Sequence, residues 1–461
     1  MVGETAKNHR KTRAPMRKTI ALQLSLVPPV VDHPHAREVA RISEILDKLS
    51  AASELVAKDL AKGTKATRAG RAGMSGEQVL RAGMLKQMHC WSYEDLAFHL
   101  SDSPTFRTFC RIGMMQSAPK RSSLAENIKR VKPETFELVN QLVVGRAKKE
   151  GVENGKRVRV DSTVIDSNIH HPLDSSLLYD VVRVLTRILK KARRWSDGLM
   201  FSSHTKRAKR RMLDIVNARS MAHRVPIYRE LLKLTGWTLE YAVHAAPILR
   251  ESSDLRARAA ADALEHYFKL GRKVVDQTER RVFQQESVPA GEKLVSIFEP
   301  HTDVIVKDRR QTLYGHKLFL SVGASGMILD LLMERGNPAD ATRAIPMLER
   351  HRALMGKAPE QVAFDAGFTS TANIATARTL GVKHASFAKK GSIDVVPGTR
   401  SPKMYKSLQR FRAGVEGIIS FTKRCFGFDR CTWRGYSSFQ AYAWASVLCT
   451  NLLLMARRTM T

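Results

Sequence analysis

The stretch RVRVDSTVI, from Arg157 to Ile165, decides the fold class of this chain. Valines alternate with polar residues along it, and this period of two is typical of a β-strand. Val158 and Val160 point to one face, so Asp161 points to the opposite face. The sequence therefore predicts a strand that buries valines on one side and presents a carboxylate from its middle on the other.

Further strand patterns follow downstream and alternate with helices. HKLFLSVGA (316–324) and MILDLLMER (327–335) flank a turn at Ser325–Gly326 and predict a β-hairpin. QVAFD is a short apolar segment that ends at Asp365, and HASFA (384–388) is another. A helix from about 339 to 355 separates the hairpin from these two strands. This succession predicts an α/β fold built on a mixed sheet.

Composition predicts the kind of partner. The 461 residues include 77 Lys and Arg against 44 Asp and Glu, which gives a formal charge of +33. The chain cannot balance this excess itself, so nucleic acid is the leading candidate partner. Five cysteines without zinc spacing indicate buried thiols in a reducing cytoplasm. The last apolar stretch, 439–455, contains Thr450 and Asn451, so it predicts a buried core helix and no membrane span.

The chain divides into parts by pattern. Residues 1–74 predict a basic flexible segment with one helix around 36–62. Residues 75–150 predict a helical N-terminal DNA-binding domain, with capping boxes at Ser92 and Ser123; a scaffold with a solvated basic surface is an equal interpretation. Residues 155–461 predict the α/β domain, and a helical insertion dense in Arg and Lys interrupts it at about 175–292.

A late segment, QRFRAGVEGIISFTKRCFGFDRCTWRG (409–435), predicts a helix with one unusual face. Arg412, Glu416 and Lys423 are spaced by four and then seven residues, so they project from one side of the helix. An apolar stripe beside that face, which includes Val415, suits burial against a core. Such a helix can give one acidic ligand to a metal ion and two cations to phosphate.

Three acids stand on elements that this fold would bring together. Asp161 lies mid-strand, Asp365 ends a strand, and Glu416 lies on the late helix. Each alone is weak evidence, because acidic residues are common on surfaces. Together they can hold two divalent ions, Mg²⁺ or Mn²⁺, roughly 3.5–4 Å apart, with waters and phosphate oxygens as further ligands. The trio therefore predicts metal-assisted phosphoryl transfer.

At these residues the chain resembles the DDE transposases of bacterial insertion sequences, and most of all their ISNCY-type group. The resemblance covers roughly residues 75–458. Singly its motifs are moderately specific, and in this order along the chain they are strongly specific. The motifs are VDSTVIDSNIHHPLDSSLLYD, YGHKLFLSVGASG, GNPADAT, FDAGF, VEGIISFTKRCFGFDRCTWRG and NLLLMAR.

The resemblance implies a ribonuclease-H-like catalytic core in which the trio binds the metal ions and carries the catalysis. The family signature around the glutamate matches Arg412 and Lys423, and it has a tyrosine where this chain has Gln409. A role for that hydroxyl is therefore not carried over. Arg412, Lys423 and the adjoining Arg424 are expected at DNA phosphates, because Lys423 shares the helix face of the glutamate.

Several polar residues near the first strand have plainer interpretations. Asp166 lies on the opposite strand face from Asp161, which disfavours it as a metal ligand. His170 and His171 follow the strand and are expected to be structural, although imidazoles can also bind metal or phosphate. Asp174 precedes two serines and most simply starts a helix.

Other candidates for DNA contact lie further along. Tyr314 and His316 are expected to pack at the sheet edge, and Trp433 is expected to be buried. The basic runs 190–194 and 206–211 either clamp a DNA backbone or form a solvated helix face.

The sequence thus predicts a cytoplasmic, nucleoid-associated transposase. It would bind the terminal inverted repeats of its element, cleave the ends with Mg²⁺, and join the freed 3′-hydroxyl to target DNA, as a homodimer in a synaptic complex. A metal-dependent nuclease of the same fold that cuts without integration is the alternative, and the large basic insertion favours the synaptic assembly. A non-enzymatic DNA-binding protein on a decayed core is a third hypothesis, which the intact trio disfavours.

Overall fold

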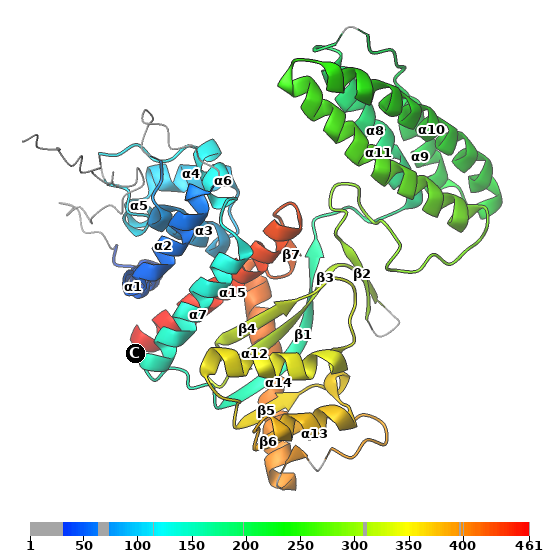
Figure 1. Ribbon diagram of the computed structural model, residues 1–461. Coiled ribbons are helices and arrows are strands. Elements are labelled where there is room, and N and C mark those ends of the chain that lie inside the picture. Colours follow the sequence, from blue (N-terminus) through cyan, green and yellow to red (C-terminus); the bar gives the residue numbers. More distant parts are fainter. Residues whose placement is uncertain are drawn as a thin grey trace, which may run out of the picture.

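The computed structural model describes residues 31–62, 73–113, 115–196, 198–307, 311–395, 398–399 and 401–460. The basic segment predicted at the start of the chain falls largely outside these residues. Figure 1 shows that the described residues form a cluster of N-terminal helices, a sheet with covering helices, and a separate helical bundle.

Within the described residues, seven strands form one mixed sheet. They are β1 (Arg157–Ser167), β2 (Asp303–Lys307), β3 (Gln311–Gly323), β4 (Ile328–Met333), β5 (Gln361–Phe364), β6 (His384–Phe387) and β7 (Arg430–Cys431). The main path runs β2-β3-β1-β5-β6, with β4 paired to β3 and β7 paired to β1. β1 is antiparallel to β3 and parallel to β5, so the predicted mixed α/β sheet is confirmed.

The predicted hairpin is present as β3 and β4. Gly326 closes its turn with φ +85°, a conformation that glycine adopts without strain. β3 starts earlier than predicted and also pairs with β2, a strand that the sequence patterns did not indicate. The helix expected around 339–355 divides into a 3₁₀ turn, η1 (Asp340–Arg343), and α12 (Ala344–Met355).

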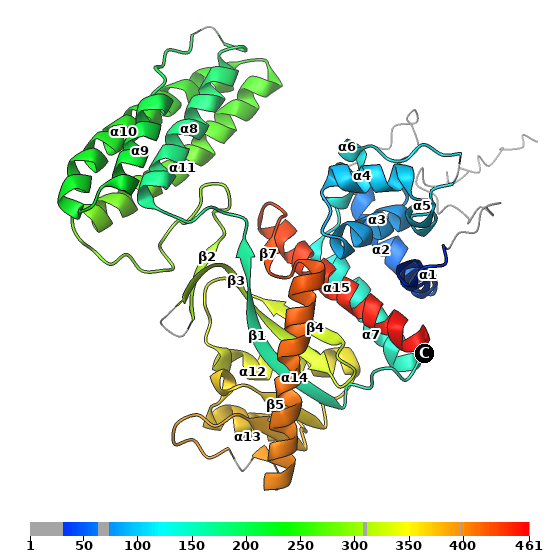
Figure 2. The same cartoon turned by 180° about the vertical axis from the view of Figure 1, so that it is seen from behind.

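Helices cover both faces of the sheet. α14 (Pro402–Phe426) crosses one face over β1, β5 and β6, and it lies in front of the sheet in Figure 2. α12 packs against β3 and β4 on the other face, with α13 (Thr371–Thr379) beside β6, as Figure 1 shows. The sheet is therefore sandwiched, and its strands lie close to helices on both sides.

The N-terminal cluster consists of short helices, as predicted, but some of its boundaries differ. One helix expected around 36–62 is two, because Leu49 leaves the helical conformation and lets each half bury its own apolar face. The capping box at Ser92 is confirmed, whereas Ser123 lies inside its helix and caps nothing. The helices are α1 (Pro34–Asp47), α2 (Ser50–Ala61), α3 (Gly76–Met88), α4 (Tyr93–Asp102), α5 (Pro104–Phe109), α6 (Arg121–Ile128) and α7 (Pro133–Lys149).

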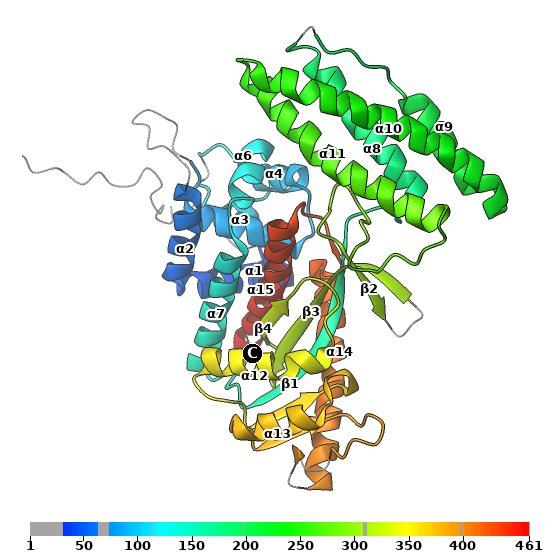
Figure 3. The same ribbon diagram turned by 45° about the vertical axis from the view of Figure 1, so that its right-hand side comes forward.

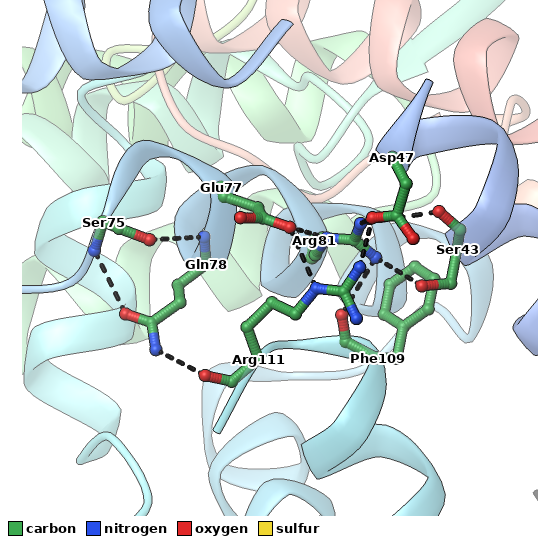
Figure 4. Close-up of polar contacts among 8 residues, drawn as sticks. All are labelled: Ser43, Asp47, Ser75, Glu77, Gln78, Arg81, Phe109 and Arg111. Atoms are coloured by element: carbon green, nitrogen blue, oxygen red, sulfur yellow. Dashed lines mark hydrogen bonds and ion pairs between the residues drawn. The ribbon is translucent and has the colours of Figure 1, made fainter. Parts of the chain in front are cut away.

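Two arginines fix this cluster, as Figure 4 shows. Arg81 on α3 is 1% exposed, and it lies 2.6 Å from Asp47 of α1 and 3.0 Å from Glu77. Arg111 pairs with the same two carboxylates, although its backbone has φ +56°, a strained value for a side chain of this kind. Gln78 donates to the Arg111 carbonyl at 3.0 Å and holds that strained turn in place. Two carboxylates shared by two guanidiniums thus join α1, α3 and the segment after α5.

The helix α15 (Tyr436–Met460) connects the N-terminal cluster to the sheet. It runs alongside α7 and also contacts α1, α3 and β4 (Figures 1 and 3). One continuous hydrophobic core includes Val39, Leu85, Val160 and Leu452. In the described part of the chain, α15 is the helix long and apolar enough to cross a membrane, and 89% of its apolar window is buried inside the protein. The predicted buried core helix is confirmed.

The insertion between β1 and β2 is a helical bundle. Its helices are α8 (Asp174–Ala192), α9 (Thr205–Asn217), α10 (Met221–Glu251) and α11 (Leu255–Val282). It has a hydrophobic core of its own, separate from the core under the sheet, and it projects away from the sheet in Figure 3. The predicted helical insertion is therefore present as a distinct packed unit.

A buried polar chain anchors the segment that returns from the bundle. His301 lies 2.7 Å from Glu299 and 2.8 Å from His316, and His316 lies 2.7 Å from Asp303. His316 is 0% exposed, so it packs inside the protein as predicted. The predicted place at the sheet edge is wrong, because β3 lies between β2 and β1. This chain connects the return segment, β2 and β3.

The amide of Asn451 generates a prediction about stability. It bonds to both backbone groups of Ile328 at 2.8 and 2.7 Å and to Asn140 at 2.8 Å, and so links α15, β4 and α7. Asn451→Leu should lower the free energy of unfolding by about 3 kcal/mol or more, because each buried polar group left unpaired costs about 1–3 kcal/mol. Denaturant unfolding measures this loss.

The neighbouring Thr450 provides the control. It is also buried, but its hydroxyl bonds within α15 to the Ser446 carbonyl and across to Thr422. Thr450→Val should cost only about 1 kcal/mol. An equal loss in both variants would contradict a linking role for Asn451.

Candidate active site

Alternate residues of β1, from Arg157 to Asp161, form a face that packs against one side of α14. Arg157 and Arg159 place their guanidiniums 4.4 and 4.7 Å from the Phe411 ring, and Arg159 donates to the Phe411 carbonyl at 2.9 Å. Gly414 makes this approach possible, because a Cβ there would lie 2.3 Å from the Arg159 side chain. Two residues further along the same face, Asp161 reaches the helix. Because alternate side chains of a strand share one face, Asp161 lies against α14 together with Arg157 and Arg159.

The structure brings Asp161, Asp365 and Glu416 around one guanidinium. Arg412 lies 3.8 Å from Asp161, 3.5 Å from Asp365 and 3.7 Å from Glu416. Asp161 comes from the middle of β1, Asp365 directly follows β5, and Arg412 and Glu416 are one turn apart on α14. Three acids that are far apart in the sequence thus meet at one point.

The three carboxylates differ in their surroundings. The side chain of Asp161 is 15% exposed, that of Asp365 is 45% exposed and that of Glu416 is 70% exposed. Burial raises the pKa of Asp161 to about 6, and the neighbouring charges of Asp365 and Glu416 act in the same direction. Arg412 opposes this effect. The cluster therefore carries like charges that a nearby cation stabilises.

The donor set fits a hard divalent cation. It consists of carboxylate oxygens, which Mg²⁺ and Mn²⁺ prefer, and a positive group already lies among them. Among the described residues, no three acidic, histidine or cysteine side chains are close enough as they stand to hold an ion. An ion at this point would replace the charge of the Arg412 guanidinium, so its entry requires Arg412 to move aside.

The other two predicted cations lie further along α14. Lys423 donates to the Val164 carbonyl at 3.2 Å and lies 3.5 Å from Asp429. Arg424 is exposed and makes a long contact of 3.4 Å to the Ser420 carbonyl. Lys423 is therefore held in place by β1, and Arg424 is available to solvent.

A hollow of about 690 Å³ opens over the carboxylates. Its wall includes the three acids, Arg412, Lys423 and Arg424, and also Asp429, which the sequence analysis did not single out. Asp429 follows α14 by three residues, and no spacing rule marked it. The predicted trio and the predicted cations thus line a single open site.

Lys317 and Asp340, two further charged residues that the sequence analysis did not single out, support the site from the side. Lys317 on β3 lies 2.6 Å from Asp340, whose other oxygen lies 3.4 Å from the Ser162 hydroxyl. A Cβ at Gly367 would come within 2.4 Å of Asp340. Asp340 therefore packs against the neighbour of Asp161 and against the turn that follows Asp365. Its position in the GNPADAT motif was the available signal.

Two of the remaining candidates, His170 and Asp174, have the structural roles predicted for them. By contrast, Trp433 is only half-buried, and Asp166 lines a second hollow together with Asp161 and Asp365. His170 pairs with Asp180 of α8 at 2.8 Å, and Asp174 begins α8 and pairs with Arg281 at 2.8 Å. Asp166 donates its backbone N–H to the Asp429 carbonyl at 2.8 Å. Trp433 packs against the main hydrophobic core. None of these four belongs to the group around Arg412.

Two family models match the chain in separate segments. One, described as "Transposase DDE domain", matches residues 273–452, which include Asp365, Arg412 and Glu416. The other, described as "Transposase domain (DUF772)", matches residues 30–130, the N-terminal helices α1 to α6. Asp161 lies between the two matched ranges, and the second range begins within α11 of the insertion.

A curated relative of uncharacterized function is similar to part of the chain. The "Uncharacterized protein ORF8 in nfe locus" of Rhizobium meliloti is 32% identical over 145 residues, which cover 30% of this chain and 66% of the relative. No solved structure matches the chain significantly.

Both matched models describe transposase domains, one over the N-terminal helices and the other over the later part of the chain, which includes most of the sheet. They agree also with an acidic trio on the sheet and the helix that covers it. Together the two matches support a DDE transposase of an insertion sequence.

Proposed function

We propose that this transposase binds the terminal inverted repeats of its element, cleaves DNA at the ends with divalent metal ions, and joins the 3′-hydroxyl to target DNA. One observation carries the proposal: Asp161, Asp365 and Glu416 surround the guanidinium of Arg412 within 3.5–3.8 Å. Three carboxylates at one point suit phosphoryl transfer, where divalent cations would balance the negative charges of the carboxylates and of the substrate phosphate. Double-stranded DNA is the polyanion that a formal charge of +33 favours.

We propose a ribonuclease-H-like arrangement for the catalytic core. The strand order β2-β3-β1-β5-β6, with β1 parallel to β5 and antiparallel to β3, supports it. The placement of the acids on β1, after β5 and on the covering helix supports it further. Membership of the ISNCY-type group stays a prediction from the motifs.

Asp161, Asp365 and Glu416 would hold two ions, Mg²⁺ or Mn²⁺. When bound, the ions would activate the attacking oxygen and stabilise the leaving oxygen. The residues of the chain have their own parts in this proposal. Asp161 is the buried, fixed ligand, and the more exposed Asp365 and Glu416 can adjust to the ions. Arg412, once displaced from the carboxylates, is within reach of a substrate phosphate.

Arg412, Lys423 and Arg424 are proposed contacts to the DNA backbone. All three line the same hollow as the acids, so a phosphodiester placed at the carboxylates would lie beside them. Synapsis of two ends requires two active sites, and we therefore propose a homodimer on DNA. The protein would act in the cytoplasm, at the nucleoid.

Removal of each acid should separate chemistry from binding. Asp161→Asn, Asp365→Asn and Glu416→Gln should each lower cleavage of end-containing DNA by about 10²-fold or more, because the charge that holds the ions is lost. Binding of the same duplex without divalent ions should change little. Asp262→Asn, an exposed acid on α11, is the control and should cleave normally. Full activity in any of the three variants would remove that residue from the site.

Joining must be measured as well as cleavage. The wild-type protein, given pre-cleaved ends and a supercoiled target, should form strand-transfer products. Cleavage without joining would support the nuclease alternative instead.

Ion binding can be followed without activity. Mg²⁺ or Mn²⁺ should raise the melting temperature of the DNA-free protein, because an ion that binds only the folded state stabilises it. The increase should vanish with EDTA and be much smaller in Asp161→Asn. An equal increase in that variant would place the ions elsewhere.

Lys423 tests the proposed backbone contacts. Lys423→Ala should weaken DNA binding and reduce the slope of log K against log salt concentration by about 0.9, the value for one lost phosphate contact. Gel-shift titrations at several salt concentrations measure the slope. An unchanged slope would place Lys423 away from the DNA.

A further inference from the structure

The positive charge of the insertion is concentrated in one short segment. Residues 183–211 contain eleven Lys and Arg and one acid, Asp197. Residues 212–292 contain twelve Lys and Arg against eleven Asp and Glu. Most of the bundle is therefore balanced in charge, and nearly all of its excess lies at the end of α8, along the following loop and on α9.

Six of these cations form what we call the basic stripe. All six are exposed, and within the described residues none of them is in an ion pair with a carboxylate. They are Lys190, Lys191, Arg194, Lys206, Lys209 and Arg210.

The bundle positions α9 so that its cations face outward. Arg207 and Arg211 lie 2.5 and 2.6 Å from Glu230 of α10 and so attach α9 to the bundle. His204 stacks on Tyr241 of α10, and Ala208 is buried beneath the helix. The stripe residues of α9 lie on the remaining sides of the helix. Two cations of α9 are thus used for attachment, and three remain for a partner.

The two halves of the basic stripe lie on neighbouring helices. α9 packs against both α8 and α10, while α8, α10 and α11 pack against one another. The exposed side of α8 therefore lies beside α9. Cations at this density repel one another, and a polyanion relieves the repulsion as it releases its own counterions.

We propose that the basic stripe binds the phosphate backbone of duplex DNA outside the segment held at the carboxylates. The inference rests on the proposed function, which supplies DNA as the polyanion. The six residues are all long cations, and Lys191 lies over the Trp195 ring at 5.6 Å. A run of exposed positive side chains suits phosphates better than the core of a protein interface, where charged residues are depleted. Contacts of this kind carry no sequence information, so the stripe grips flanking or target DNA of any sequence.

The position of the bundle agrees with a second stretch of DNA. The insertion follows β1 along the chain, and its bundle projects away from the sheet (Figures 1 and 3). A helix rises ~1.5 Å per residue, so the end of α8 at Ala192 lies roughly 27 Å along its axis from Asp174. DNA that reaches both the carboxylates and the stripe must therefore continue well past the reacting phosphate.

The experiment compares two triple variants of the full-length protein. The stripe variant is Lys206→Gln, Lys209→Gln and Arg210→Gln. The control is Lys269→Gln, Arg272→Gln and Lys273→Gln, which removes three exposed cations with the same spacing from α11, in the balanced part of the bundle. Binding of an end-containing duplex with long flanks is titrated at several salt concentrations without divalent ions, and melting temperatures check folding.

The stripe variant should reduce the slope of log K against log salt concentration by about 2 to 3, from ~0.9 for each lost phosphate contact, and the control should change it by much less. Shortening the flanks of the duplex should abolish the difference between the stripe variant and the wild type. Equal slopes for the stripe variant and the wild type would overturn the proposal and favour an acidic protein as the partner of the stripe.

The salt dependence of DNA binding can be measured whether or not the protein cleaves and joins DNA. A wild-type protein that neither cleaves nor joins DNA, with a stripe variant of reduced slope, would overturn the proposed function and leave the inference standing. Normal cleavage and joining by the wild type, with the same slope in the stripe variant, would support the proposed function and overturn the inference about the stripe.

Discussion

The alignment of α14 along β1 is the constraint on which the site depends. Phe411 lies over the strand arginines, Arg412 reaches Asp161, and Lys423 bonds to Val164, so the helix follows the strand for most of its length. A slip of one residue in the strand would turn Asp161 to the opposite face. The register is protected because valines on the other face are buried in the main core. The precision of the site therefore comes from packing that has no chemical part in it.

Much of this arrangement could be predicted from the sequence, because it rests on local periods. Alternation in β1 gave the face of Asp161, and helical spacing gave the common face of Arg412 and Glu416. The position of Arg412 among the acids could not be predicted, since it depends on three elements that meet only in the folded chain. Asp340 was missed for the same reason, because its partner Lys317 and the turn it supports are distant in sequence. The break between α1 and α2 at Leu49 was also missed, because it depends on the two helices burying different apolar faces in the folded chain.

The insertion separates strands that are neighbours in the sheet. β1 and β3 are adjacent in the sheet, yet the four-helix bundle lies between them in the sequence. Because the cost of closing a loop grows only slowly with its length, the sheet tolerates a long insertion here, and the insertion folds around its own core. The bundle also satisfies its own hydrophobic residues, so the sheet does not depend on it for burial. An insertion of this kind can change its surface charge without disturbing the strand that carries Asp161.

The continuous core has a consequence for biosynthesis. α15 is the last described helix, and it supplies the contacts that α1, α3 and α7 need for their apolar faces. More than 280 residues separate α7 from α15, so these contacts are among the most non-local in the protein. During synthesis the N-terminal helices leave the ribosome long before their partner does, with residues such as Leu85 and Val143 still uncovered. The packing of the N-terminal helices is therefore complete only after α15 has emerged.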